Sequence, residues 1–257
     1  MFSSKTKSLG LVAITAFFVT GCGGSSDAGF CGYDAYGDPI FCQVNQPPAP
    51  LPPVVASTLT FPVTQGLTNI ATQNYSYIIS ATDSSGNIFS IDYASVPGTV
   101  TTFGQVQANT ANVTQSYSEN NSQLQTTTTT NYFIPAPYQF LGSESTLAGR
   151  SEVVNTWQAP PATGTVGQTF PSISATLYHD STNTMVDGTL SETIGLSPDT
   201  ANTALLCMVD TIQLTQAGVN DGLSNGTTSN CFRIDPSGNV LGLQMSTPVN
   251  GVTMLFY

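Results

Sequence analysis

The chain has 257 residues, a formal net charge of −11 and only four lysine or arginine residues. A surface this poor in cations repels nucleic acid and anionic lipid headgroups, so the composition excludes nucleic-acid binding. Charged residues make up 7% of the chain. This argues against long solvent-exposed helices, because such helices normally carry Glu and Lys pairs.

The first 22 residues have the layout of a secretory signal peptide. Two lysines precede an apolar run from Leu9 to Val19 that is too short to span a bilayer. The residues Val-Thr-Gly-Cys at 19–22 resemble the lipobox of bacterial lipoproteins. This resemblance implies cleavage after residue 21, lipidation of Cys22 and attachment to the membrane through its acyl chains. Gly23 follows that cysteine, and by the same resemblance it favours the outer membrane. The alternative is an ordinary secretory cleavage that leaves a free thiol.

Residues 22–55 form a predicted tether between this anchor and a β domain at residues 56–257. An aromatic loop from Phe30 to Cys42 precedes a proline-rich stretch at 46–53, which favours an extended spacer. Tyr33, Tyr36 and Phe41 are candidate ligand contacts in this loop. The alternative is that the loop is a small structural staple. Beyond residue 21 the chain has no lysine, and Arg150 and Arg233 are its only arginines.

Four cysteines remain once Cys22 is assigned to lipid, namely Cys31, Cys42, Cys207 and Cys231. An even number in an oxidising compartment favours two disulfides, for which the sequence allows three pairings. We expect Cys31 with Cys42 and Cys207 with Cys231, because each pair is close in sequence and the second would join adjacent strands. Zinc is the alternative, but no CxxC pair occurs and the single histidine is far from any cysteine in sequence. We predict no metal and no cofactor.

Residues of the β domain alternate in polarity with a period of two, as in half-buried strands. Runs at 75–80 and 88–93 flank the hairpin turn Asp83–Asn87, and runs at 231–234 and 240–245 flank the similar turn Asp235–Asn239. Further strands are expected at 100–107, 113–117, 124–134, 152–157, 172–179, 189–194, 203–214 and 252–256. Only Ser197-Pro198-Asp199 carries a helix-start signal. The sequence therefore predicts an all-β fold, an antiparallel sheet forming a sandwich, barrel or half-barrel, with at most one or two short helices.

No catalytic arrangement is visible in the sequence. His179 lies between Tyr178 and Asp180, but neighbours on a strand point to opposite faces and form no relay among themselves. We therefore interpret His179 as a strand-end residue. A glycosidase would need two carboxylates about 5–10 Å apart. Four glutamates are candidates, and nothing in their spacing pairs them: Glu119, Glu144, Glu152 and Glu192. Trp157, near Pro160, Pro161 and Phe170, is either core or the lining of an apolar pocket.

The leading hypothesis is a lipid-anchored envelope lipoprotein whose noncatalytic β domain binds a partner protein, a glycan or an apolar ligand. A half-barrel lipid carrier, of the general type seen in lipoprotein-sorting factors, is one version of it. That version predicts an apolar cavity, and a filled core would contradict it. The first alternative is an envelope carbohydrate hydrolase with two facing carboxylates. The second is a structural surface lipoprotein.

Overall fold

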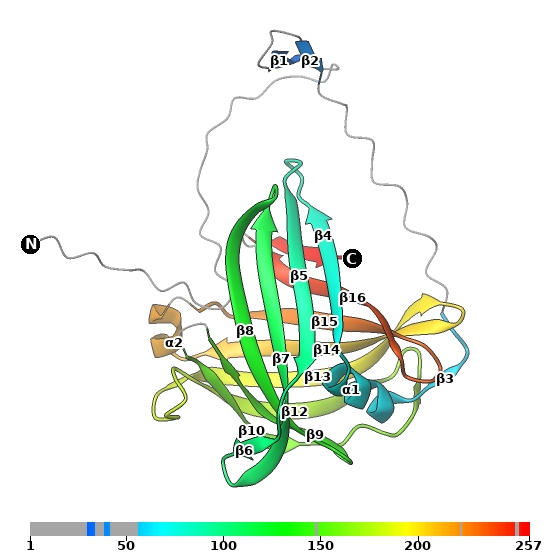
Figure 1. The fold of residues 1–257 in the computed structure, drawn as a ribbon, viewed down its shortest axis with the longest axis vertical. Helices are drawn as coiled ribbons and strands as arrows, with labels where there is room; N and C mark the ends of the chain where they lie inside the picture. The colour runs from blue at the N-terminus through cyan, green and yellow to red at the C-terminus, as the bar shows by residue number, and fades with distance from the viewer. Residues whose placement is uncertain (1–29, 34–38, 42–55, 147–148, 222, 250–251) are drawn as a thin grey trace, which may run out of the picture. The chain divides into compact units, whose positions relative to one another are not determined.

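The computed structural model describes residues 30–33, 39–41, 56–146, 149–221, 223–249 and 252–257 (Figure 1). Strands β1 (Phe30–Tyr33) and β2 (Pro39–Phe41) form a small antiparallel hairpin in which Phe30 is opposite Phe41. The predicted lipidation site Cys22, the predicted contact Tyr36 and the predicted disulfide partner Cys42 lie outside the described residues. Only the backbone is described for the hairpin, which carries Tyr33 and Phe41.

The β domain is built around one large antiparallel sheet. Its strands are β4 (Tyr75–Thr82), β5 (Ile88–Pro97), β6 (Thr101–Phe103), β7 (Val106–Glu119), β8 (Ser122–Pro135), β9 (Tyr138–Ser145), β10 (Ser151–Trp157), β12 (Thr169–Tyr178), β13 (Val186–Thr200), β14 (Thr203–Leu214), β15 (Gly226–Ile234), β16 (Val240–Val249) and β17 (Val252–Phe256). A separate short pair joins β3 (Thr60–Phe61) to β11 (Gly164–Thr165). Neighbours in the large sheet follow chain order almost throughout, with β6 paired to β7 beside the main path.

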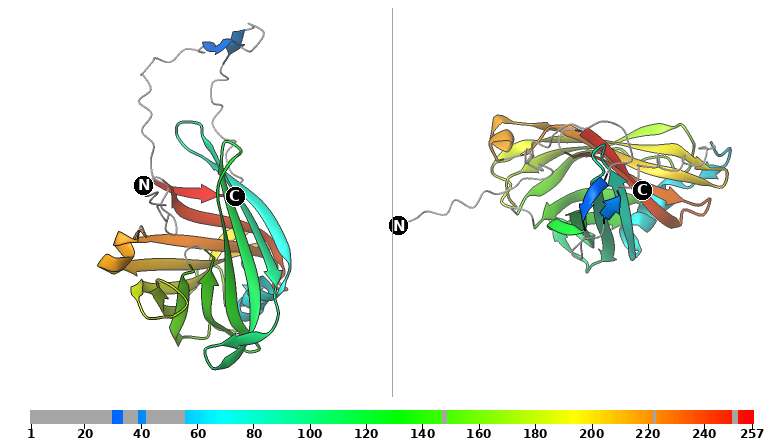
Figure 2. Two further views of the ribbon diagram at one scale, coloured as in Figure 1. Left: turned by 60° about the vertical axis from the view of Figure 1, so that its left-hand side comes forward. Right: turned by 90° about the horizontal axis from the view of Figure 1, so that it is seen from above.

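The sheet curls until its two edges almost meet. Two backbone hydrogen bonds of 3.3 Å join Ser80 in β4 to Tyr257, which follows β17. In Figure 1, β4, β5, β7 and β8 cross in front of β12 to β15, and the turned view in Figure 2 shows them as two separate walls. The predicted all-β antiparallel fold is confirmed, in the form of a nearly closed, barrel-like sheet.

Hairpin turns account for much of the connectivity. Gly86 and Gly238 have φ of 87° and 82°, and Asp83 and Asp235 each accept backbone N–H bonds within their own turns. Positive φ at glycine and a capping aspartate are what such turns require, so both predicted turns are confirmed. The expected strand at 100–107 is split into β6 and β7 by a turn at Gly104, whose φ is 60°.

Helix α1 (Val63–Thr72) was not predicted from the sequence, and the helix start expected at Ser197-Pro198-Asp199 is wrong because these residues lie within β13. Pro62 gives α1 no side-chain cap, and Leu67 and Ala71 are buried on one face of the helix. The Asn69 amide donates to the Gly238 carbonyl at 2.7 Å and fixes the helix to the second hairpin turn.

The second helix, α2 (Gln216–Asn220), is a single short turn after β14. Thr215 caps it, accepting a hydrogen bond from the Gly218 N–H. No helix among the described residues is long and apolar enough to cross a membrane.

The two largest apolar clusters among the described residues hold the sheet together. The larger one joins the β4–β5 wall to β15, β16 and β17 through Ile79, Ile91, Tyr93, Phe232 and Phe256. The second packs α1 against β13, β14 and β15, where Leu67 meets Ile194, Leu206 and Ile234. Burial of side chains this size contributes about 1.5–3 kcal/mol each, so these clusters compensate for the missing helix cap of α1. Between them the interior is not filled.

Candidate functional site

A cavity of about 420 Å³ lies inside the sheet, between its two walls. This is within the range of about 300–1,000 Å³ typical of small-molecule sites. One face of α1 lines it, and so do apolar residues from both walls: Leu67, Ile70, Ala71, Tyr75, Tyr93, Val113, Phe133, Tyr138, Phe140, Trp157, Ile173, Leu190, Ile194, Met208, Ile212, Phe232 and Met245. The sequence left Trp157 open between core and pocket wall. The structure places it in the wall, with its ring 5.7 Å from that of Tyr138 in an edge-to-face contact.

Four carboxyl groups line the same cavity: Asp187, which is paired with Arg150, and three that have no such partner, Glu152, Glu192 and Asp210. Glu192 in β13 and Asp210 in β14 are directly opposite each other in the ladder, and Glu152 comes from β10. Burial raises the pKa of Glu152 to about 7, that of Glu192 to about 8 and that of Asp210 to about 7. Repulsion from Asp210 adds to the shift of both glutamates. The cavity therefore holds acids that bind protons near neutral pH.

The four glutamates considered in the sequence have different surroundings. Glu152 and Glu192 come together in the cavity, where Ser143 Oγ donates to Glu152 Oε2 at 3.1 Å. Glu144 instead accepts a hydrogen bond from the Tyr132 hydroxyl at 2.9 Å, and Glu119 lies at the end of β7. Neither of the last two lines the cavity.

Asp210 escaped notice in the sequence, although a signal was present. Along β14 it occupies the position between Met208 and Ile212 on the cavity face, just as Glu192 stands between Leu190 and Ile194 on β13. Residues two apart on a strand share a face, so an acid in phase with apolar neighbours points toward the interior. This spacing from apolar neighbours predicts that both Glu192 and Asp210 face the interior.

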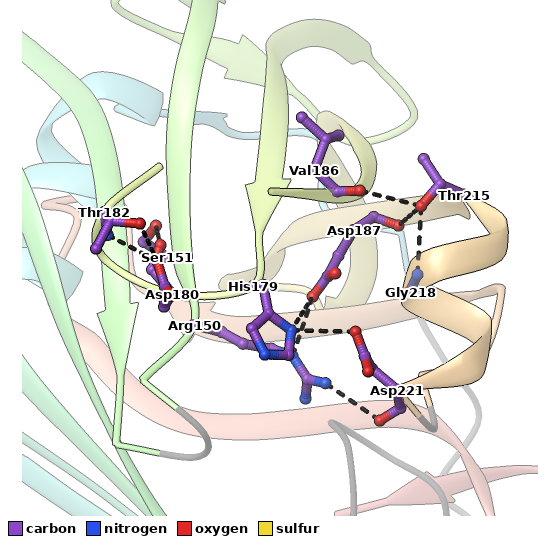
Figure 3. A network of polar contacts seen from close by, with 10 residues as sticks. All are labelled: Arg150, Ser151, His179, Asp180, Thr182, Val186, Asp187, Thr215, Gly218 and Asp221. Carbon is purple, nitrogen blue, oxygen red and sulfur yellow. Dashed lines mark hydrogen bonds and ion pairs between the residues drawn. The ribbon is translucent and has the colours of Figure 1, made fainter. Parts of the chain in front are cut away.

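A second polar cluster lies at the end of the sheet where β10, β12 and β13 meet α2 (Figure 3). Arg150 is 8% exposed and Asp187 is fully buried. Arg150 Nε donates to Asp187 Oδ2 at 3.3 Å, and Nη2 donates to the Asp221 backbone carbonyl at 3.3 Å. His179 Nδ1 lies 3.1 Å from Asp221 Oδ2 and 3.7 Å from Asp187 Oδ2.

His179 follows the last residue of β12, the strand-end position expected from the sequence, but its two carboxylate partners were not foreseen. Among the described residues, no serine or threonine hydroxyl hydrogen-bonds to it. The nearby Ser151 hydroxyl is bonded to Asp180 and Asn183, and the Thr215 hydroxyl to two backbone carbonyls. A hydrolytic triad needs a hydroxyl beside its histidine, and neither of these two hydroxyls is bonded to His179.

His179, Asp187 and Asp221 have ligand atoms within 4.8 Å of one another, a spacing that suits a metal ion. Arg150 already contacts Asp187 and the backbone of Asp221. A guanidinium in this position supplies the positive charge that two neighbouring carboxylates require, and it repels a second cation. We therefore interpret this cluster as an ion-pair network that fastens α2 to the sheet.

The disulfide Cys207–Cys231 is confirmed, and it links residues directly opposite each other in β14 and β15. With both sulfurs bonded, neither is available to zinc. Arg233, the other arginine of the β domain, makes two hydrogen bonds to the Asp199 carboxylate, at 2.7 and 2.9 Å. Neither Arg233 nor Asp199 lines the cavity, so this ion pair lies away from it.

Comparison of the chain with protein-family models, curated proteins and solved structures gave no match.

Proposed function

We propose that this protein is a lipid-anchored envelope lipoprotein whose noncatalytic β domain binds a small apolar or amphipathic ligand inside its sheet. The observation that carries the proposal is the cavity of about 420 Å³ with its largely apolar lining. Protein interiors are normally close-packed, and an unfilled volume costs the contacts its lining would otherwise make. A bound ligand restores those contacts, whereas a purely structural domain would be more stable if larger side chains filled the space.

The arrangement of α1 supports a carrier. The helix places Leu67, Ile70 and Ala71 along the cavity while it packs on β13 to β15, so it covers part of the interior without filling it. The lipobox at 19–22 and the proline-rich stretch at 46–53 would hold such a domain near a membrane that supplies its ligand.

Ligand binding can be tested with a neutral environment-sensitive fluorophore and a cavity-filling variant. Ile212 lines the cavity, so Ile212→Trp should occupy part of its volume and weaken binding of the fluorophore about tenfold or more. Ile78 is 75% exposed on β4, and Ile78→Trp is the matched control that should bind as the wild type does. Circular dichroism verifies that both variants fold. Failure of the wild type to bind, or equal binding by Ile212→Trp, would contradict the proposal.

The anchor needs its own test. The mature N-terminus of the protein purified from membranes should begin at Cys22 and carry acyl chains, which mass spectrometry detects. Cys22→Ser should remove the lipid and release the protein from the membrane fraction. An unmodified Cys22 in the wild type would remove the membrane placement and leave the ligand-binding proposal standing.

A hydrolase acting on envelope carbohydrate is the second candidate, favoured by Glu152 and Glu192 lining one cavity with pKa values raised to about 7 and 8. A carboxylic acid with such a pKa suits general acid catalysis near neutral pH. The partner carboxylate must be ionised, however, and here burial raises the pKa of all three acids. Hydrolysis of a glycoside that Glu192→Gln abolishes would establish the hydrolase. Binding without turnover would support the carrier.

A further inference from the structure

Of the four carboxyl groups that line the cavity, Glu152, Glu192 and Asp210 have no cation beside them. Arg150 is the only lysine or arginine among the described residues that line the cavity, and its ion pair is with Asp187. Within the described part of the chain, Glu152, Glu192 and Asp210 take part in no ion pair. The domain therefore encloses a group of acids for which it provides no counter-ion.

A fourth buried acceptor in the cavity lacks a donor. Asn230 in β15 lines the cavity, and its Oδ1 is buried without a hydrogen-bond partner. Asp210 faces Thr228 in the β14–β15 ladder, and Asn230 is two residues further along the same face. Such diagonal neighbours are about 7–8 Å apart, and opposite residues such as Glu192 and Asp210 have Cβ atoms about 4.5–5.5 Å apart. This part of the wall offers acceptors that need a donor.

Burying carboxyl groups together is costly unless they take up protons or meet a cation. Without a ligand they bind protons, and the pKa values raised to about 7 and 8 express that cost. A cation between them would stabilise the ionised carboxylates and displace the protons. Among the described residues, only His179, Asp187 and Asp221 have three ligand atoms gathered within 4.8 Å, so the three cavity acids are not arranged as a compact metal site. An ammonium group suits acceptors that are somewhat further apart, because its N–H···O bonds of about 2.7–2.9 Å are longer than metal–oxygen bonds of about 2.0–2.6 Å.

We propose that the ligand of this cavity is an amphipathic organic cation whose protonated amine lies between Glu192, Asp210 and Glu152. The inference rests on the proposed function and names the chemical class of its ligand. The apolar part of the molecule points toward α1, since Ile194 and Met208 lie on that side of the acids and pack on the helix cluster. The three N–H groups of the ammonium donate to the Glu192 and Asp210 carboxylates and to Asn230 Oδ1, and the Glu152 carboxylate adds its negative charge nearby.

The test uses three n-alkyl compounds of equal chain length, an amine, an alcohol and a carboxylate, each displacing a neutral fluorophore from the β domain at pH 7. The amine should bind at least about tenfold more tightly than the alcohol, the effect of one charge-assisted hydrogen bond. The carboxylate should bind most weakly. Isothermal titration calorimetry in two buffers of different ionisation enthalpy should show proton release with the amine and none with the alcohol.

Glu192→Gln and Asp210→Asn should abolish the preference for the amine while alcohol binding persists, and Glu152→Gln provides a further variant if one of them does not fold. Glu119→Gln, which changes a glutamate outside the cavity, is the matched control and should keep the preference. Equal affinities for amine and alcohol in the wild type would overturn this inference and leave the carrier intact. Failure of the fluorophore and all three compounds to bind would instead overturn the carrier.

Discussion

Glu152 should destabilise the ligand-free domain at neutral and alkaline pH. Burial is the main reason that its pKa rises from 4.5 to about 7, and repulsion from Asp210 contributes. In the unfolded chain this carboxyl loses its proton near the ordinary value. The stability that depends on a protonated Glu152 is therefore fully present below about pH 4.5. It is lost as the pH rises to about 7, because the folded domain must then bury a charge. At 1.36 kcal/mol for each pKa unit, the loss amounts to at most about 3 kcal/mol.

Glu152→Gln removes the titrating group and keeps the shape of the side chain. Relative to the wild type, the variant should gain up to about 3 kcal/mol in free energy of unfolding at pH 8, less the weakened bond from Ser143. The gain should shrink to nothing near pH 4.5. Because Asp210 repels Glu152, Asp210→Asn should lower the pKa of Glu152.

Urea unfolding between pH 4.5 and 8, followed through the fluorescence of Trp157, measures this difference, since the chain has one tryptophan. Glu119→Gln serves as the control because Glu119 does not line the cavity, and its profile should parallel that of the wild type. If Glu152→Gln also runs parallel to the wild type over the whole range, Glu152 is not a buried acid and the electrostatic account of the cavity fails.

Three further predictions concern the frame around the cavity. Replacing Cys207 and Cys231 by Ala opens a loop with a sequence separation of 24 and should lower the free energy of unfolding by about 3 kcal/mol, measured with urea. Asp199→Asn disrupts the paired hydrogen bonds with Arg233, which lower the pKa of Asp199. The variant should lose about 1 kcal/mol in free energy of unfolding at pH 7. This difference from the wild type should vanish as the pH falls below the ordinary range of an aspartate. Gly218→Ala places a methyl group in collision with the Asp187 backbone oxygen of β13, so it should displace α2 and lower the melting temperature, at a cost of roughly 1–3 kcal/mol in free energy of unfolding.

The sheet was predictable because its signals are local. Alternating polarity marks most strands, and the turn residues Asp83–Asn87 and Asp235–Asn239 determine two hairpins. β9 escaped because Tyr138–Ser145 contains a glycine at 142 with φ of 151° and a register shift in its pairing with β8, which interrupts the period of two. The pairing of Cys207 with Cys231 followed from the expectation that their strands are adjacent, and β14 and β15 are neighbours.

Helix α1 could not be predicted because its cause is tertiary. The helix has no side-chain cap, no acidic residue in its first turn and no basic residue in its last. Three threonines, at 64, 68 and 72, lower its intrinsic propensity further. It forms because Leu67 packs against Ile194 and Leu206, contacts that exist only once the sheet has curled. A short helix of this kind gains its stability from the packing of one apolar face.

The same curling explains why the site was only half visible in the sequence. Glu152, Glu192 and Asp210 lie on three different strands, and only the sheet order β10-β12-β13-β14 places them on one wall. Arg150 could have been their counter-ion, since it is one of only two arginines in the β domain. It is instead committed to Asp187 at the α2 end of the same cavity. Because a buried charge is stable only when it is paired or neutralised, the acids must be satisfied by protons or by something that enters from outside. The pattern of charge in the interior therefore argues for a cationic ligand more strongly than the size of the cavity does.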